Sequence, residues 1–366
     1  MSEQFIVSAR KYRPATFESV VGQKAVTDTL KNAIRTNKLA QAFLFCGPRG
    51  VGKTTCARIL AKAVNAADPD NLEKLSEDQL NIFELDAASN NSVDDIRNLI
   101  DQVRIAPAAG KKFKVYIIDE VHMLSAQAFN AFLKTLEQPP AYAIFVLATT
   151  EKHKILPTIL SRCQVFDFQR IKIQDMTEHL QYIAEKEGIQ ADKEALHIIA
   201  TKADGGLRDA LSIFDQMVAF GGTNITYDLV IENLNLLDYE YYFKITDALV
   251  DGNISDLLLT FDEILSKGFD GHNFIVGLGD HFRNLLVGLD PRTRELIVAG
   301  EQLTNRYSDQ AVKAGTQNLI RWLKSCNKAD TTYKISKHPR LLIELALIEM
   351  SEIAGLEKKK SLSQAQ

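Results

Sequence analysis

The segment from Gly47 to Thr54 has the composition and spacing of a loop that binds the phosphates of a nucleoside triphosphate. It reads G-P-R-G-V-G-K-T, and its glycines let the backbone wrap closely enough for N–H groups to face phosphate oxygens. We expect Lys53 to reach the β- and γ-phosphates and the hydroxyl group of Thr54 to ligate Mg²⁺. The predicted nucleotide-binding residues here are Gly47, Pro48, Arg49, Gly50, Val51, Gly52, Lys53, Thr54 and Thr55.

The residues on either side of this segment suit a phosphate-binding loop. The preceding run, Ala42 to Cys46, is apolar, as a buried strand would be, and the following run, Thr55 to Val64, alternates at helical spacing. The alternative is a glycine-rich turn that matches the motif by chance. Such a turn would need neither the preceding strand nor the following helix. The positive end of the following helix would add to the attraction for phosphate.

An acidic pair follows a second apolar run, Phe113 to Asp119. Asp119 at the end of a strand could hold Mg²⁺, directly or through water, and Glu120 could polarise a water molecule that attacks the γ-phosphate. A solvated loop is the usual alternative for Asp-Glu after a strand, but the phosphate-loop motif upstream favours catalysis. His122 is left unassigned, as a residue of a loop or of a helix entry.

Two arginines further along the chain lie in short motifs. Neither motif by itself indicates a functional arginine. Arg162 lies in Ser-Arg-Cys before an apolar run, where an arginine is usually a surface residue. Arg208 opens a helical pattern and could simply pair with Asp209. Their order behind a phosphate loop and an acidic strand end makes them candidates.

The elements that must position these residues alternate between strands and helices in the first half. Continuously apolar runs separated by helices indicate a parallel sheet covered on both faces. The expected strands are 42–46, 81–86, 113–119, 143–150 and 164–168, and the expected helices are 23–35, 92–104 and 125–137. Ser92 is the expected N-cap of its helix.

After about Arg170 the strand pattern disappears. Helices are expected at 174–187, 193–203 and 207–220, a turn-like break at 221–224, and an all-helical pattern from Asp238 to about Gly355, interrupted at Gly268, Gly271 and Pro339. We therefore predict an α/β nucleotide-binding domain (1–170), a small helical lid domain (171–236) and an all-α collar domain (237–366).

Composition bounds the class of protein. The chain has 366 residues, 46% hydrophobic and 25% charged, with a formal net charge of −4, as in ordinary globular proteins. No apolar run is long enough to cross a bilayer, and the first residues do not form a signal segment. The four cysteines form no C-x-x-C pair. These features predict a cytoplasmic protein without disulfides and without a membrane partner.

The motifs together resemble one family, the ATPase subunits of the bacterial sliding-clamp loader, the gamma/tau subunits of DNA polymerase III, within the AAA+ ATPases. The resemblance covers about Ser8 to Asp215 in motifs and extends to about Gly355 in helical layout. The matching segments are Tyr12 to Phe17, Val20 to Gln23, Gly47 to Thr54, Asp119 to His122, Leu147 to Thr150, Ser161 to Cys163 and Gly206 to Asp209.

The resemblance implies roles for individual residues. Arg162 looks like an arginine finger that acts in trans on ATP of the neighbouring subunit, a device that contributes ~10³–10⁵ in rate. Arg208 looks like the lid sensor of the γ-phosphate, and either Thr149 or Thr150 looks like the strand-end sensor that orients water. The segment around adenine would comprise Tyr12, Arg13, Val20, Val21 and Gly22.

The family also implies partners. These are other clamp-loader subunits in a pentameric ring joined by the collar, the sliding clamp and primer-template DNA. Ser92 and Arg97 are plausible contacts to DNA phosphates, and the alternative is an ordinary capped surface helix. The expected activity is ATP hydrolysis that loads the clamp, with no polymerase active site in this chain.

One departure from the family pattern is large. Relatives commonly carry four cysteines that form a zinc knob after the phosphate-loop helix, whereas residues 65–79 contain no cysteine. Cys56 alone cannot make such a site, so we predict ATP and Mg²⁺ as cofactors and no zinc.

Two other functions compete with this interpretation. The first is another AAA+ machine, such as a branch-migration motor, and the Ser-Arg-Cys triplet and the all-helical last domain favour the loader over it. The second is a scaffold subunit of the same ring that has lost hydrolysis. The presence of Lys53, Thr54, Asp119 and Glu120 argues against such a scaffold.

Overall fold

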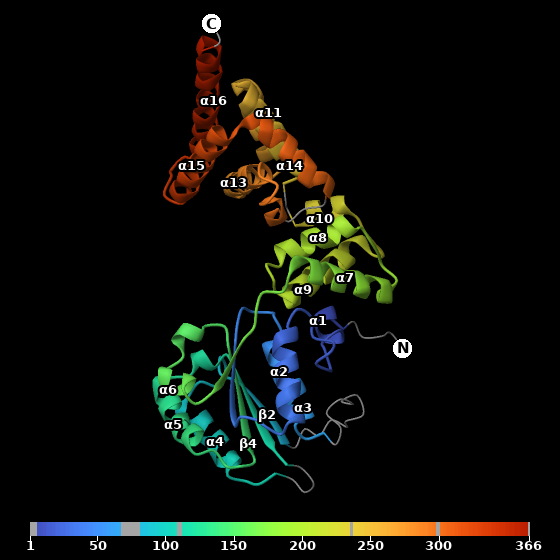
Figure 1. The fold of residues 1–366 in the computed structure, drawn as a ribbon, viewed down its shortest axis with the longest axis vertical. Coiled ribbons are helices and arrows are strands. Elements are labelled where there is room, and N and C mark those ends of the chain that lie inside the picture. Colours follow the sequence, from blue (N-terminus) through green and yellow to red (C-terminus); the bar gives the residue numbers. More distant parts are fainter. Residues whose placement is uncertain (1–5, 67–80, 108–111, 235–236, 298–300, 365–366) are drawn as a thin grey trace. The chain divides into compact units, whose positions relative to one another are not determined.

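The computed structural model describes residues 6–66, 81–107, 112–234, 237–297 and 301–364 (Figure 1). The chain divides into two compact units, Met1–Val230 and Ile231–Gln366. The division falls inside helix α10 (Tyr227–Asn233). The three-domain boundaries expected from the sequence stay a prediction.

The first unit is built on a parallel sheet of five strands in the order β2-β3-β4-β1-β5. These strands are β1 (Ala42–Cys46), β2 (Ile82–Asp86), β3 (Lys114–Asp119), β4 (Ala143–Thr149) and β5 (Gln164–Asp167). The predicted α/β fold is confirmed. Because all strands run in one direction, the loops that follow β1, β3 and β4 emerge at the same edge of the sheet.

Helices cover both faces of this sheet (Figure 1), which is why the two strands β1 and β4 are apolar and buried along their whole length. Phe43 and Phe45 of β1 pack on one face with α2 (Lys24–Arg35) and α3 (Lys53–Ala63). Leu44 points to the opposite face, where it packs with the other layer of helices. That layer comprises α4 (Val93–Val103), α5 (Ala126–Glu137) and α6 (Pro157–Leu160).

Local capping sets where two of these helices begin. The Ser92 side chain accepts a hydrogen bond from the backbone N–H of Asp95, whose carboxylate in turn accepts from the backbone N–H of Ser92. Ser125 accepts from the N–H of Ala128 at the start of α5. Both serines satisfy backbone donors that the first helical turn leaves free, so these helix starts agree with the sequence prediction.

After β5 the first unit continues with three helices, one short strand pair and the start of α10. The helices are α7 (Ile173–Glu187), α8 (Lys193–Lys202) and α9 (Leu207–Gly221). The prediction that no strand follows Arg170 is wrong, because β6 (Gln190–Ala191) pairs in parallel with β7 (Asn224–Ile225). Strands of two residues are too short to show alternation, so tertiary contacts decide them.

The second unit is helical, as predicted. Its elements are α11 (Tyr239–Asp251), α12 (Ile254–Ser266), α13 (Gly271–Gly288), η5 (Arg294–Leu296), α14 (Glu301–Ala314), α15 (Thr316–Tyr333) and α16 (Pro339–Gln364). Trp322 is fully buried in its core and donates from Nε1 to the carbonyl of Met350 at 3.0 Å. Within the described ranges, no helix of either unit combines the length and apolarity that a membrane span needs.

Candidate active site

The phosphate loop lies between β1 and α3, where its glycines adopt conformations that other residues avoid. Gly47, Gly50 and Gly52 have φ angles of 152°, 76° and 104°. A Cβ atom on Gly47 would stand 2.5 Å from the carbonyl oxygen of Phe168. The loop therefore needs glycine for both backbone conformation and close packing.

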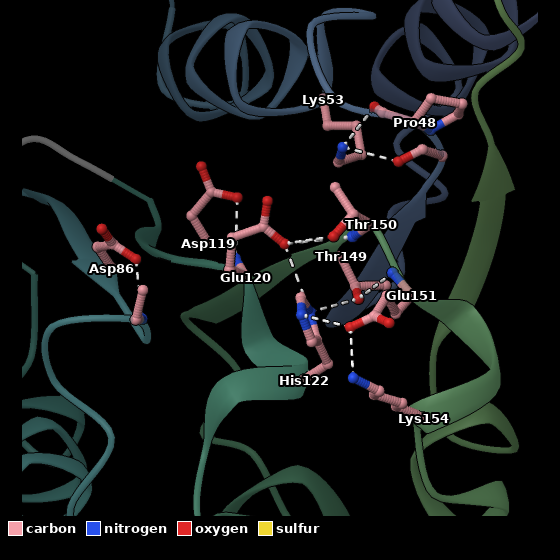
Figure 2. A network of polar contacts seen from close by, with 12 residues as sticks. Pro48, Lys53, Asp86, Asp119, Glu120, His122, Thr149, Thr150, Glu151 and Lys154 are labelled. Atoms are coloured by element: carbon pink, nitrogen blue, oxygen red, sulfur yellow. Dashed lines mark hydrogen bonds and ion pairs between the residues drawn. The ribbon is translucent and has the colours of Figure 1, made fainter. Parts of the chain in front are cut away.

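Lys53 begins α3 and its ammonium group is held inside the loop (Figure 2). Nζ donates to the carbonyl oxygens of Gly47 and Pro48, each at 2.8 Å. Burial lowers the pKa of Lys53, and the charges of Glu120 and Asp119 oppose that shift. The ammonium group of Lys53 is thus held where a phosphate would bind, close to the carboxylates of Asp119 and Glu120.

The two predicted magnesium ligands lie together. The hydroxyl group of Thr54 donates to Oδ2 of Asp119 at 2.6 Å, although the residues come from α3 and the end of β3. A hydroxyl oxygen beside a carboxylate is a set of hard oxygen donors that suits Mg²⁺. The residues present therefore fit a Mg²⁺ ion shared with nucleotide phosphates.

Glu120 is held against the end of β4. Its Oε2 atom accepts from the backbone N–H of Thr150 at 3.2 Å and from the Thr150 hydroxyl at 2.9 Å. Its own N–H donates to Oδ1 of Asp119 at 2.9 Å. Of the two candidate sensor residues, Thr150 contacts the carboxylate directly, whereas Thr149 is fully buried.

His122 lies in the middle of this cluster, in η3 (Val121–Met123), and its side chain is only 6% exposed (Figure 2). Nδ1 is 3.0 Å from Oγ1 of Thr149 and 3.4 Å from Oε2 of Glu120. Nε2 is 3.0 Å from Oε2 of Glu151. Sequence reasoning left His122 unassigned and missed Glu151, because only the folding of β4 beside β3 brings these residues together.

Glu151 is itself anchored by a lysine. Lys154, at the end of η4 (Lys152–Lys154), lies 2.7 Å from its Oε2 atom. The hydrogen bond to this ammonium group holds the pKa of Glu151 below its usual range, with smaller contributions from the charges of Lys154, His122 and His153. Glu151 is therefore a carboxylate, and so an acceptor, at neutral pH.

The start of α9 packs directly on the phosphate loop. The backbone N–H of Arg208 donates to the carbonyl of Gly50 at 3.4 Å. A Cβ on Gly50 would lie 3.2 Å from Cα of Gly206 and 3.4 Å from Cβ of Arg208. The structure thus brings the predicted lid sensor to the loop, with its side chain exposed.

Arg162 follows α6, and its guanidinium is bound to α5 and α6. Nη1 donates to the carbonyl of Thr158 at 2.7 Å and Nη2 donates to Oε1 of Glu137 at 2.9 Å. About a third of the side chain, 34%, is exposed. The guanidinium is therefore anchored at the surface, and its predicted role on a neighbouring subunit stays a prediction.

The residues predicted to surround adenine are only partly brought together. Cγ1 of Val20 lies 3.9 Å from where a Cβ of Gly52 would be, beside the phosphate loop, and Gly22 packs against Ile171. Tyr12 instead donates its phenol hydrogen to Glu187 of α7. Burial and Glu187 raise the pKa of Tyr12 to about 12. The adenine role of these residues, and of Arg13 and Val21, stays a prediction.

The two side chains predicted to contact DNA, Ser92 and Arg97, both pair with aspartates in the first turn of α4. The Ser92 hydroxyl donates to Oδ2 of Asp95 at 2.6 Å within the capping arrangement. Arg97 pairs with Asp94 one turn earlier, at 3.2 Å, and is 68% exposed. Such an exposed pair contributes little stability, so Arg97 could exchange its partner for a phosphate. The DNA contacts of Ser92 and Arg97 stay a prediction.

The zinc prediction concerns a segment that falls largely outside the described residues, since 67–80 are not described. Among the residues that are described, no group of three or more His, Cys, Asp or Glu side chains could hold a metal ion. The prediction of no zinc stays open.

The family models that match this chain all describe subunits of DNA polymerase III. The chain matches three family models: "DNA polymerase III, delta subunit" at residues 22–172, "DNA polymerase III clamp loader subunit, ATPase lid domain" at 175–223, and "DNA polymerase III subunits gamma and tau domain III" at 225–365. Among solved structures it is similar to the Holliday junction branch migration motor RuvB of Thermotoga maritima, with 20% identity, a TM-score of 0.49, and coverage of 65% of this chain and 79% of that one.

Two curated relatives show the extent of the similarity. DNA polymerase III subunit tau of Bacillus subtilis is 40% identical over 94% of this chain, which spans 62% of that protein's length. DNA polymerase III subunit gamma of Buchnera aphidicola is 38% identical over 74% of this chain and 75% of its own length. On these matches, the chain belongs to the gamma/tau family of DNA polymerase III subunits.

Proposed function

We propose that this chain is the ATP-hydrolysing motor subunit of a clamp loader, which places a sliding clamp on primer-template DNA during replication. The observation that carries the proposal is the meeting of two pairs at one edge of the sheet. These are Thr54 with Asp119 at 2.6 Å and Glu120 with Thr150 at 2.9 Å. The first pair suits a metal-bound phosphate, and the second suits an attacking water molecule.

The chemistry assigned to each residue follows from its position. Backbone N–H groups of the phosphate loop and Lys53 would bind the phosphate oxygens, which requires Nζ to exchange its two carbonyl partners for phosphate. Mg²⁺, held by Thr54 and Asp119, would neutralise charge on the β- and γ-phosphates. Glu120 would orient and polarise the water, and Thr150 would hold that carboxylate in place.

We further propose that the site works in a ring of clamp-loader subunits. Arg162 would complete the nucleotide site of the neighbouring subunit, and Arg208 would read the γ-phosphate of its own subunit from the lid. The helical second unit would supply the ring contacts as a collar, and α4 would follow the DNA backbone through Ser92 and Arg97. The assembly would act in the bacterial cytoplasm.

The direct test is the rate of ATP hydrolysis by the reconstituted complex, with and without clamp and primed DNA. We expect both to stimulate turnover, because DNA in the ring would bring Arg162 against the neighbour's nucleotide. A turnover rate unaffected by either would contradict the proposal. A strand-separation assay should show no activity, whereas branch migration would favour the rival motor.

Complementation tests the arrangement in trans. Rings made only of Arg162→Ala or only of Glu120→Gln subunits should each lose DNA-stimulated turnover. Rings that mix the two should recover part of it, because some interfaces then join an intact Glu120 to a neighbour's intact Arg162. If the arginine acted within its own subunit, mixing would restore nothing. Arg35→Ala, an exposed arginine at the end of α2, is the control and should not affect turnover.

A further inference from the structure

His122 is a buried polar side chain that the proposed mechanism leaves unused. Its ring contacts the end of β4 at two points, since one nitrogen faces Thr149 and the other faces Glu151 just beyond the strand, each at 3.0 Å. The His122 side chain is only 6% exposed, and its Nδ1 atom lies 3.4 Å from the candidate catalytic carboxylate of Glu120. Its burial at this place suggests a role in the site.

The partners determine which nitrogen carries hydrogen. In the tautomer that carries its single ring hydrogen on Nε2, that nitrogen donates to Glu151, and the lone pair of Nδ1 accepts from the hydroxyl of Thr149. Oγ1 of Thr149 in turn accepts from the N–H of Glu151 at 3.0 Å. Each hydrogen of the chain Thr149–His122–Glu151 thus has one acceptor, and the arrangement is self-consistent.

These contacts are linked to the carboxylate of Glu120 through the backbone at the end of β4. Thr149 is followed by Thr150, whose N–H and hydroxyl are the two donors that hold Glu120. The carbonyl of Thr149 also accepts from the N–H of Gly47 at 3.2 Å, at the first residue of the phosphate loop. Fixing Thr149 therefore fixes the base relative to the loop.

We propose that His122 is a positioning residue: oriented by Glu151, it fixes the end of β4 so that Thr150 holds the Glu120 carboxylate for attack on the γ-phosphate. The inference rests on the proposed function, because it takes Glu120 as the residue that activates water. His122 itself touches no substrate in this account. It acts as the partners of catalytic groups do elsewhere, by holding the working geometry.

A merely structural histidine would behave differently. If His122 only filled space, its loss would lower the unfolding temperature and weaken nucleotide binding together, and any polar or apolar replacement of similar size would serve. A positioning role instead predicts a loss in kcat with little change in KM or in nucleotide affinity. It also predicts that recovery depends on which ring nitrogen a replacement imitates.

The experiment compares three substitutions at position 122 in the complete complex with clamp and primed DNA. His122→Ala should lower kcat on the order of 10–100-fold, since catalysis is sensitive to small displacements, with nucleotide affinity nearly unchanged. His122→Asn places an amide near the position of Nδ1 and should recover part of kcat. His122→Gln reaches toward Glu151 but loses the contact with Thr149, so it should recover less.

Two further variants sharpen the result. Glu151→Gln should lower kcat less than His122→Ala, because a neutral amide oxygen still accepts from Nε2. His153→Ala is the matched control, an adjacent histidine that is 76% exposed and 3.9 Å from Glu151, and it should leave turnover unchanged. Thermal unfolding of every variant shows whether it is folded.

The outcomes separate this inference from the proposed function. A wild-type complex that clamp and DNA do not stimulate would contradict the proposed function. A stimulated wild type with a His122→Ala variant of normal kcat would overturn the inference alone. Equal recovery by Asn and Gln, or a matching loss of nucleotide affinity, would reduce His122 to a structural residue.

Discussion

At the scale of single residues, the assignment of Glu120 can be checked directly. Glu120→Gln keeps an acceptor oxygen for Thr150 but removes the charge that would polarise water in the proposed mechanism. We therefore expect ATP binding to persist while turnover falls by orders of magnitude. Nucleotide affinity by fluorescence and single-turnover hydrolysis measure the two effects separately. Hydrolysis at the wild-type rate would show that another group activates the water.

A second residue-scale prediction concerns His281, buried in the helical unit. Its Nε2 donates to Oε1 of Gln310 at 3.0 Å, and its Nδ1 has no hydrogen-bond partner. Burial lowers the pKa of His281 to about 4, with the Gln310 contact opposing the shift and the charge of Arg306 adding to it. A proton on Nδ1 would be buried without an acceptor, so the folded state keeps the ring neutral.

The sign of the pH effect follows from linkage. The unfolded ring titrates near ~6.5, so between that pH and about 4 the unfolded state holds more protons than the folded state. The free energy of unfolding should therefore fall as pH drops through this window, by at most about 3 kcal/mol. Urea titrations of the chain, followed by Trp322 fluorescence, measure it. His281→Gln should flatten the dependence, and His338→Gln, at an exposed position, should not.

Residue chemistry was predictable from the sequence only where it depends on a contiguous motif. Lys53 and Thr54 belong to one short segment, and their partner Asp119 could be placed because parallel strands end at one edge. His122 and Glu151 could not be identified from the sequence, because only their neighbours in the folded structure mark them as part of the site. Those surroundings come from β4, which is remote in the sequence.

At the scale of elements, the contact between α9 and the phosphate loop makes a specific prediction. Gly50→Ala would place a methyl group 3.2 Å from Cα of Gly206, in a backbone with φ of 76°. We expect a loss of stability of roughly 1–2 kcal/mol from the left-handed conformation. We also expect weaker ATP binding, because the start of α9 must move off the loop.

The control for this substitution is Gly188→Ala, after α7. Gly188 has a similar φ of 67°, and a Cβ there would meet nothing within 4 Å. It should lose comparable stability without any change in ATP affinity. If both variants bind ATP like the wild type, the lid contact does not contribute to nucleotide binding.

The elements themselves were largely predictable because their determinants are local. Ser92 and Ser125 cap the helices that they precede, and mainly apolar runs of five to seven residues form β1, β3 and β4. The pair β6 and β7 was missed because two residues carry no periodic signal. The short helix α6, which leads into Arg162, was not predicted because a single turn depends on its packing.

At the scale of the whole molecule, the two units have separate hydrophobic cores and should respond separately to ligand. The chain has a single tryptophan, Trp322, and it is fully buried in the second unit. Its fluorescence thus reports the unfolding of that unit alone, whereas far-ultraviolet circular dichroism reports both. The arrangement offers an internal comparison within one sample.

We expect Mg-ATP to raise the unfolding temperature of the first unit only. Ligand at a hundred times its dissociation constant adds about 2.7 kcal/mol to the unit that binds it, so the circular dichroism transition should split or shift. The Trp322 transition should stay in place. Lys53→Ala should abolish the shift, and a Trp322 transition that moved with ATP would show that the units unfold together.

The backbone at Glu120 implies a trade-off between stability and activity. Its φ of 46° and ψ of 44° lie in the left-handed region, which suits asparagine or glycine better than a longer side chain. Glu120→Asn should therefore unfold at a higher temperature than the wild type while losing hydrolysis. A screen for thermostable variants would accept that change, and only an assay of turnover would reject it.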